Sequence, residues 1–472
     1  MRKPLLVTLL ALAASGCMVG PDYVRPPVDT PAAWRLSEQD ARDLANTAWW
    51  EQFGDPVLND LVATALRENK DLMIAAARVE QFAGNYGIVR SGLFPQVGAG
   101  YEVRRQRDIS AVVVGAGGDE TYNSYNAVLN ASWEIDIWGR IRRQTEAARA
   151  QLMASEEGRR AVILSLVGSV SGAYINLRDL DRQLDIARAT AKSRGESYEI
   201  FKLRFAGGII SVLELSQNRS QYEEALASIP PLEKAIAQQE NGLSVLLGRN
   251  PGPIPRGKDI DHLALPAIPA GLPSDLLERR PDIRRTEQDL IAANAQIGAA
   301  KAAYFPTISL TGLFGYASTS LSNLFDSQSK VWSYGSPITM PIFTAGAIAG
   351  QVQAAEAAQQ QALFAYQKAI QEAFREVNDS LVSRDRTREQ LKAQRRQVEA
   401  LQQYAATARL RYDNGYTSYI EVLDAERSLF NVQLQYTQTQ QVEFQSMINL
   451  YLAMGGGWVS EAEKVASTSS AQ

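Results

Sequence analysis

The chain has 472 residues, with 48 basic and 52 acidic side chains but only one cysteine and one histidine. One cysteine excludes a disulfide within the chain, and these two residues cannot supply a Cys/His metal site. A Ser-His-Asp site would need His262, which lies in the Pro-rich stretch DIDHLALPAIPAG and is more simply explained as a solvated loop histidine. We therefore expect neither an enzyme nor a cofactor. The sequence has no block of basic residues that would indicate nucleic-acid binding.

The N-terminus predicts a signal peptide over residues 1–16. The basic start MRK is followed by the apolar run PLLVTLLALAAS, which is shorter than the roughly 20 residues that span a bilayer. The run ends in ASGC, which resembles a lipobox in which Cys17 becomes the lipidated first residue; the alternative is a free cysteine near the cleavage site. Met18 replaces the Asp that retains lipoproteins in the inner membrane, which favours the outer membrane.

The rest of the chain contains two copies of one unit. RFAGGIISVLELSQNRS begins at Arg204 and RYDNGYTSYIEVLDAERS begins at Arg411, 207 residues later. Segments 66–95 and 277–306 also pair, so the first repeat covers 66–250 and the second covers 277–455. A linker (251–276) joins them and a flexible tail (456–472) follows. The two copies differ by four residues in length near the middle, and residues 229–234, IPPLEK, are expected to have no counterpart in the second copy.

Each unit has the same order of predicted elements. A helix of about 24 residues (71–93; 282–304) precedes two strands. A Pro-free helical run of about 66 residues follows (140–205; 347–413), then a Gly turn and a helix of about 37 residues (211–248; 417–454). A 66-residue helix is about 100 Å long and must run beside other helices. We therefore expect rods of two helical strands with the Gly turn at one end; locally, an ordinary coiled coil explains the same pattern.

The four predicted strands, at about 95–107, 122–137, 306–317 and 331–342, alternate apolar and polar residues. A hairpin half-buried on a soluble core is one explanation. Three observations favour a membrane barrel: strand lengths near the 9–11 residues that cross a bilayer, Trp and Tyr toward the ends of the stripe, and the outer-membrane signal. Four strands cannot close a barrel and lipid excludes an open edge, so several chains are needed, and three would supply twelve strands.

Several motifs together make the chain similar to the outer membrane factor family, the TolC-like exit ducts, and most of all to the lipoproteins that serve resistance-nodulation-division drug pumps. They are CMVGPDYVRPP, WWEQFGDPVLNDLVATALRENKDL, WEIDIWGRIRR, LLERRPDI, AAYFPTISLTG, RYDNGYTSYIEVLDAERSLF and LYLAMGGGW.

The resemblance implies an α+β membrane protein: a homotrimer whose twelve-stranded outer-membrane β-barrel continues into a long α-helical barrel in the periplasm. Residues 17–65 would be a lipidated extension, carrying palmitate on Cys17, and an equatorial segment. The implied partners are outer-membrane lipid, a periplasmic adaptor (membrane fusion) protein and an inner-membrane pump, and the implied function is drug efflux and antibiotic resistance. A type I protein secretion duct and a coiled-coil structural lipoprotein without a pore are the alternatives.

The resemblance also assigns roles to the two Gly turns. The adaptor-contact tips match Gly208, Ile209 and Ser211 in the first repeat and Gly415, Tyr416 and Ser418 in the second. The acidic positions of the periplasmic gate match Glu421, Asp424 and, on the sister hairpin, Glu214, while Arg411 and Tyr412 match the network that closes it. The first ring position is often Asp in the family and is Glu here. From spacing alone, Glu421 and Asp424 would be assigned to a solvated helix face.

Overall fold

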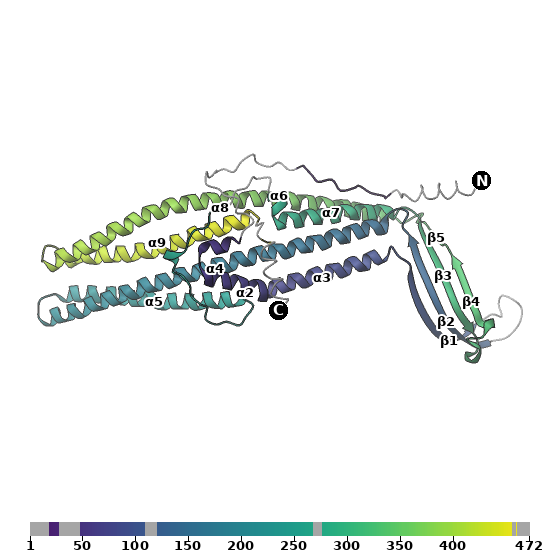
Figure 1. Cartoon of the computed structure of the whole chain (residues 1–472), viewed down its shortest axis with the longest axis horizontal. Coiled ribbons are helices and arrows are strands. Elements are labelled where there is room, and N and C mark those ends of the chain that lie inside the picture. The colour runs from purple at the N-terminus through teal and green to yellow at the C-terminus, as the bar shows by residue number, and fades with distance from the viewer. Residues whose placement is uncertain (1–17, 28–47, 109–119, 268–275, 456–458, 460–472) are drawn as a thin grey trace. The chain divides into compact units, whose positions relative to one another are not determined.

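The structure is a computed structural model that describes residues 18–27, 48–108, 120–267, 276–455 and 459. The expected signal peptide, Cys17 and nearly all of the expected tail lie outside these residues. The chain divides into two compact units (Figure 1). Unit 1 comprises Met1–Pro27, Arg78–Glu156 and Arg285–Gln367; unit 2 comprises Val28–Ala77, Glu157–Arg284 and Lys368–Gln472.

Unit 1 contains an antiparallel sheet in the order β1-β2-β3-β4, with the short β5 also paired to β3. The strands are β1 (Gln96–Asp108), β2 (Glu120–Ile135), β3 (Thr307–Ser318), β4 (Lys330–Gly335) and β5 (Ile338–Thr339). The first two come from the first repeat and the others from the second, so β2–β3 pairing joins the two copies of the unit. Among these strands, β1 and β4 are left as edges.

The register gathers the apolar side chains of all four long strands on one face of the sheet. Directly paired residues of an antiparallel sheet share a face. One cross-strand row is Ala99, Leu129, Phe314 and Trp332, and the next is Val97, Ala131, Gly312 and Tyr334. The large members are exposed, with 54% of Phe314, 67% of Trp332 and 83% of Tyr334 accessible. A soluble protein hides such a patch, so this face requires a cover outside the chain.

The strand expected at 331–342 is divided into β4 and β5. The division falls at Ser336 and Pro337. Proline lacks the N–H that a central strand needs, although the Pro337 carbonyl still accepts a hydrogen bond from the Ser309 N–H at 3.1 Å. Residues 340–342 are not in a strand, so the regular sheet ends earlier than the apolar alternation predicts.

The residues that follow Cys17 are held by side chains of helices α4 (Arg140–Ala206) and α7 (Pro281–Ala302), at positions that lie within unit 1. Arg143 is 1% exposed and donates from Nη2 to the Asp22 carboxylate at 2.7 Å and to the Gly20 carbonyl at 3.3 Å. Tyr23 and Arg25 both bind the carboxylate of Glu287, at 3.1 and 2.8 Å. These contacts hold the chain that emerges from Cys17 along the helices.

The described helices have nearly the lengths expected from sequence. The paired helices before the strands are α3 (Lys70–Ser91) and α7 (Pro281–Ala302). The long helices are α4 (Arg140–Ala206) and α8 (Ala347–Asp413), each of 67 residues, and the returning helices are α5 (Val212–Leu246) and α9 (Tyr419–Ala453), each of 35 residues. Shorter helices include η1 (Trp49–Phe53), α2 (Pro56–Glu68) and α6 (Leu276–Arg279).

Helix α5 continues through Pro230 and Pro231. It matches α9 in length, and both ends of the two helices are 207 positions apart. The expectation that IPPLEK lacks a counterpart is therefore wrong: its positional counterpart is 436–441, where the sequence is YTQTQQ. The two prolines therefore occupy ordinary helical positions and do not make α5 longer than α9. Because proline has no N–H, α5 lacks the two backbone hydrogen bonds that these positions would otherwise donate.

Unit 2 is held together by close helix packing and buried polar bonds. A Cβ on Gly168 of α4 would come within 2.5 Å of Leu452 of α9, so only glycine permits this approach. The buried Asp55 carboxylate caps α2 through the Val57 N–H at 2.9 Å and accepts from the Tyr174 hydroxyl at 2.7 Å. Among the described helices, α4 alone is long and apolar enough to cross a membrane by composition; half of that window is buried in the chain, as in an ordinary core helix.

Candidate functional site

The two Gly turns have the same backbone geometry. Gly208 and Gly415 have φ values of +70° and +77°, the left-handed region that favours glycine. At the first tip, the Gly208 N–H donates to the Phe205 carbonyl and the Ile209 N–H to the Arg204 carbonyl, both at 2.9 Å. The second tip repeats both bonds at 2.9 Å, from Gly415 to Tyr412 and from Tyr416 to Arg411. This pair of backbone hydrogen bonds is the Schellman motif that ends a helix. It turns the chain back into α5 at the first tip and into α9 at the second.

Apolar side chains are exposed around both turns. The accessible fraction is 75% for Ile209 and 76% for Tyr416, the residues that directly follow the glycines. Leu203 on the first tip and Ile420 on the second are exposed as well. Paired apolar tips of this kind suit a contact with another protein.

The serines of the two tips begin the returning helices in different ways. Ser211 and Glu214 form a capping box, in which the Ser211 N–H donates to the Glu214 carboxylate at 2.9 Å and the Glu214 N–H donates to Ser211 Oγ at 3.3 Å. Ser418 makes no such side-chain bond, although Glu421 stands in the same position relative to it. The carboxylate of Glu214 is therefore engaged in its own helix start, whereas that of Glu421 is not held in a cap.

The two acidic residues of the second tip differ in their surroundings. Glu421 is half-buried. Asp424 is exposed and forms an ion pair with Arg427 on the next turn, with Oδ1 and Nη2 3.2 Å apart. A pair this exposed contributes at most about 1 kcal/mol.

Tyr412 lies in an aromatic cluster that joins the two hairpins. Its ring is 6.1 Å from that of Phe201 on α4 and 5.0 Å from that of Tyr419 on α9. Phe201 and Tyr419 are buried and 4.4 Å apart, and the Arg204 guanidinium lies over both the Phe201 and Tyr412 rings at about 6 Å. Arg411 is exposed and forms no ion pair with another described residue. Of the two expected closing residues, Tyr412 therefore contacts the first hairpin.

Sequence reasoning did not identify the first-hairpin side of this contact. Asn218 of α5 is buried and donates from Nδ2 to the Tyr419 hydroxyl and to Ser197 Oγ, the latter at 3.2 Å. One signal was available: Phe201 and Ala408 are 207 positions apart and both belong to the buried cluster. The repeat offset thus marks matching faces of α4 and α8.

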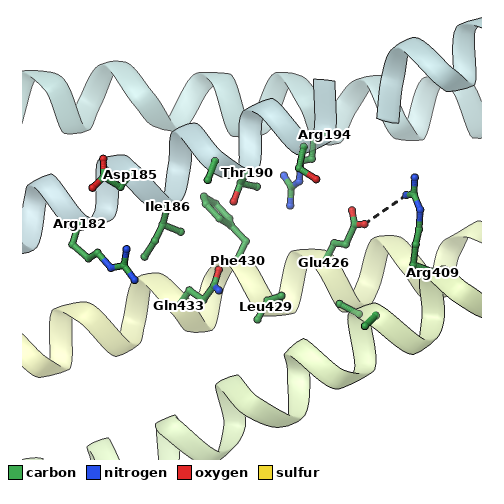
Figure 2. Close-up of a pocket in the computed structure, with 14 residues that line it drawn as sticks. Arg182, Asp185, Ile186, Thr190, Arg194, Arg409, Glu426, Leu429, Phe430 and Gln433 are labelled. Carbon is green, nitrogen blue, oxygen red and sulfur yellow. Dashed lines mark ion pairs between the residues drawn. The ribbon is translucent and has the colours of Figure 1, made fainter. Parts of the chain in front are cut away.

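A cavity of about 660 Å³ lies between α4, α8 and α9 behind the tips (Figure 2). Arg194 is almost fully buried; its Nη1 donates to the Gln221 carbonyl at 2.9 Å, and its guanidinium lies 5.4 Å from the Phe430 ring centre. Glu426 faces Arg409 across 3.7 Å, the ion pair drawn in Figure 2. Burial raises the pKa of the Glu426 carboxyl, and Arg409 and Arg194 only partly offset this. Charged groups thus line the cavity between the hairpins.

The fold and the tips together define a class of protein: a duplicated pair of long helical hairpins combined with four antiparallel strands that have an uncovered apolar face. The family profile described as "Outer membrane efflux protein" matches residues 61–249 and 272–456, one match for each repeat. The chain belongs to this family, and the predicted duplication and TolC-like fold are confirmed. It is a transport channel of the outer membrane rather than an enzyme.

Relatives cover nearly the whole chain. The "Toluene efflux pump outer membrane protein TtgF" of Pseudomonas putida is 38% identical over 470 residues, covering 97% of this chain and 98% of the relative. The "Cation efflux system protein CusC" of Escherichia coli is 37% identical over 463 residues, covering 96% and 98%. The crystal structure of the Campylobacter jejuni CmeC outer membrane channel aligns with a TM-score of 0.89 at 27% identity, covering 96% of this chain and 98% of that one.

Proposed function

We propose that the protein is the exit duct of a tripartite efflux pump and that, as a homotrimer, it conducts drugs or other small toxic compounds to the cell exterior. The observation that carries this proposal is the sheet, with an uncovered apolar face and two edge strands, β1 and β4. Lipid would cover the apolar face. The two edge strands could not stay unpaired in lipid, because unpaired backbone N–H and C=O groups are costly in hydrocarbon. Edge pairing among three copies would close a barrel of twelve strands, within the known range.

The names of the relatives favour small cargo over secreted proteins. TtgF is named for toluene and CusC for cations. The two relatives are named for different cargo, yet this chain is about equally similar to both. We therefore infer that the duct itself selects cargo weakly. Cargo choice then belongs to the inner-membrane pump of the resistance-nodulation-division type.

The hairpin tips are the proposed site for the periplasmic adaptor. Both tips present an exposed apolar residue directly after a left-handed glycine, Ile209 in one and Tyr416 in the other. Adaptor binding there would pull on the aromatic contact between Tyr412 and Phe201 and separate the hairpins. Glu421 and Asp424 of three chains would then line the opening and favour cations.

The lipid anchor at Cys17 is the fourth element of the proposal. Its support is the fixed path of residues 19–25, which Arg143 and Glu287 hold along the helices. An anchor attached to a fixed segment would add membrane affinity to a barrel that is already inserted.

Deleting the gene in the native host tests the function. We expect greater susceptibility to small toxic compounds, measured over a panel of antibiotics, toluene and metal salts, with an unchanged profile of secreted proteins. A lost secreted protein with unchanged susceptibility would instead identify a type I secretion duct.

A further inference from the structure

A second cavity of unit 2, of about 480 Å³, lies between α8, α9 and the linker residues Leu263 and Leu265. It is lined on α8 by four cationic side chains: Arg388, Lys392, Arg395 and Arg396. These residues are 19 or more positions before Gly415, whose N–H bond closes the second tip. We call this cavity the basic groove.

The four cations of the basic groove form no ion pair with another described residue. Arg388, Lys392 and Arg396 follow one another at intervals of four residues, so they share one helix face, where like charges oppose helix formation by about 0.2–0.5 kcal/mol per pair. Within the described part of the chain, none of the three has an ion pair. Of the nearby acids of α8, Asp385 and Glu389 bind Arg386, while Glu399 interacts electrostatically with Arg395 at the rim of the groove.

Among the described residues that line the other walls of the groove, one carboxylate faces these cations. It is Glu443 of α9, which is half-buried. Burial raises the pKa of Glu443, and Arg384, Arg388 and Arg395 partly counter that rise. Four cations and one acid leave the lining positive, although the whole chain has a formal net charge of −4. The groove thus concentrates positive charge on an otherwise acidic protein.

The floor of the groove is apolar. Phe444 and Leu263 are buried beneath it, Leu391 is half-buried, and Leu265 of the linker is 45% exposed. At one end, Arg395 donates from Nη2 to the Tyr436 hydroxyl at 3.4 Å. A ligand would therefore meet an apolar surface below and cations at the rim, and the volume lies in the range of small-molecule sites.

We propose that the basic groove binds an amphiphilic organic anion, with its apolar body against Leu265 and Phe444 and its carboxylate or sulfonate between Arg388 and Lys392. Charge complementarity identifies the anion, and the apolar floor separates it from inorganic phosphate or sulfate. None of the residues that line this groove belongs to the two tips.

Calorimetry can test the groove with naphthalene-2-sulfonate as the probe and naphthalene-2-sulfonamide as its uncharged match. The full-length protein would be held in nanodiscs of neutral phosphatidylcholine. We expect saturable binding of one sulfonate per chain, with the sulfonamide about tenfold weaker or more, and weaker sulfonate binding at higher salt. The double variant Arg388→Gln, Lys392→Gln should lose about tenfold in affinity, and Leu265→Ala should weaken binding by removing floor contact.

The matched control is Arg375→Gln, Arg386→Gln. It removes the same charge from exposed positions of the same helix, where both arginines pair with other acids. Glutamine is a good helix former, so both double variants should keep α8 intact, which melting curves would verify. Three results would overturn the proposal. The first is no saturable sulfonate binding, and the second is an equal loss of sulfonate affinity in the two double variants. The third is unchanged sulfonate binding in Arg388→Gln, Lys392→Gln together with dissociation of its chains, which would make the groove a contact between copies.

Discussion

Replacing Tyr412 by alanine tests whether the aromatic cluster holds the hairpin tips together. The ring of Tyr412 reaches the first hairpin through Phe201 at 6.1 Å and through the Arg204 guanidinium at 6.0 Å. An aromatic pair contributes about 0.5–1.5 kcal/mol and an exposed cation–π contact about 0.5–1 kcal/mol. Losing both would weaken the closed arrangement by about 1–2.5 kcal/mol per chain, a shift of about 5–70-fold toward the open one.

The assay is conductance in planar bilayers. Wild-type channels should conduct little, and Tyr412→Ala should raise the conductance or the fraction of time open. Tyr412→Phe keeps the ring and should behave as wild type. Tyr404→Ala, on the same helix at a 40% exposed position, controls for loss of a tyrosine from α8. Equal behaviour of Tyr412→Ala and wild type, or of the alanine and phenylalanine variants, would refute the closing role of this ring.

Three further predictions concern charge and anchoring. Glu421→Gln with Asp424→Asn should reduce cation selectivity in reversal-potential measurements, while Glu214→Gln should leave it nearly unchanged, because the Glu214 carboxylate is held in the capping box, which glutamine at this position also forms; equal selectivity changes would place all three acids in one ring. Because burial raises the pKa of Glu426, the folded state binds its proton more tightly, so stability falls as pH rises from the ordinary carboxyl pKa to the raised one. Glu426→Gln should therefore raise the melting temperature at neutral pH, with a difference that shrinks toward pH 4; a constant difference would contradict the assignment. Cys17→Ala should abolish lipid labelling but leave the protein in the outer-membrane fraction, and a soluble periplasmic species would show that the strands do not insert.

The long elements were predictable because their signals are local and repeated. Glycines at 208 and 415 fix the hairpin ends, since each must adopt a positive φ, and the apolar alternation fixes which face of each strand is shared. The register then aligns these faces across the repeats, as the pairing of Leu129 with Phe314 shows. The same alternation predicted a last strand that is too long, because a pattern of apolar residues takes no account of the N–H that Pro337 lacks.

The tip contacts were less accessible to sequence reasoning. Ser211 to Glu214 and Ser418 to Glu421 share the spacing of a capping box, yet the box forms only at the first tip. Since the local pattern is the same, tertiary contacts must distinguish the two: Tyr419, the first residue of α9, is buried against Phe201, whereas its counterpart Val212 is 65% exposed. Such contacts between distant helices are not encoded in spacing.

We expect three copies of the chain to close one barrel, because the sheet has an uncovered apolar face and two edge strands. Native mass spectrometry of the protein released from neutral nanodiscs counts the chains directly. We expect three chains per particle, and circular dichroism before release should show that the sheet is retained. Single chains with an intact sheet would contradict it, because four strands alone leave both edges open in lipid.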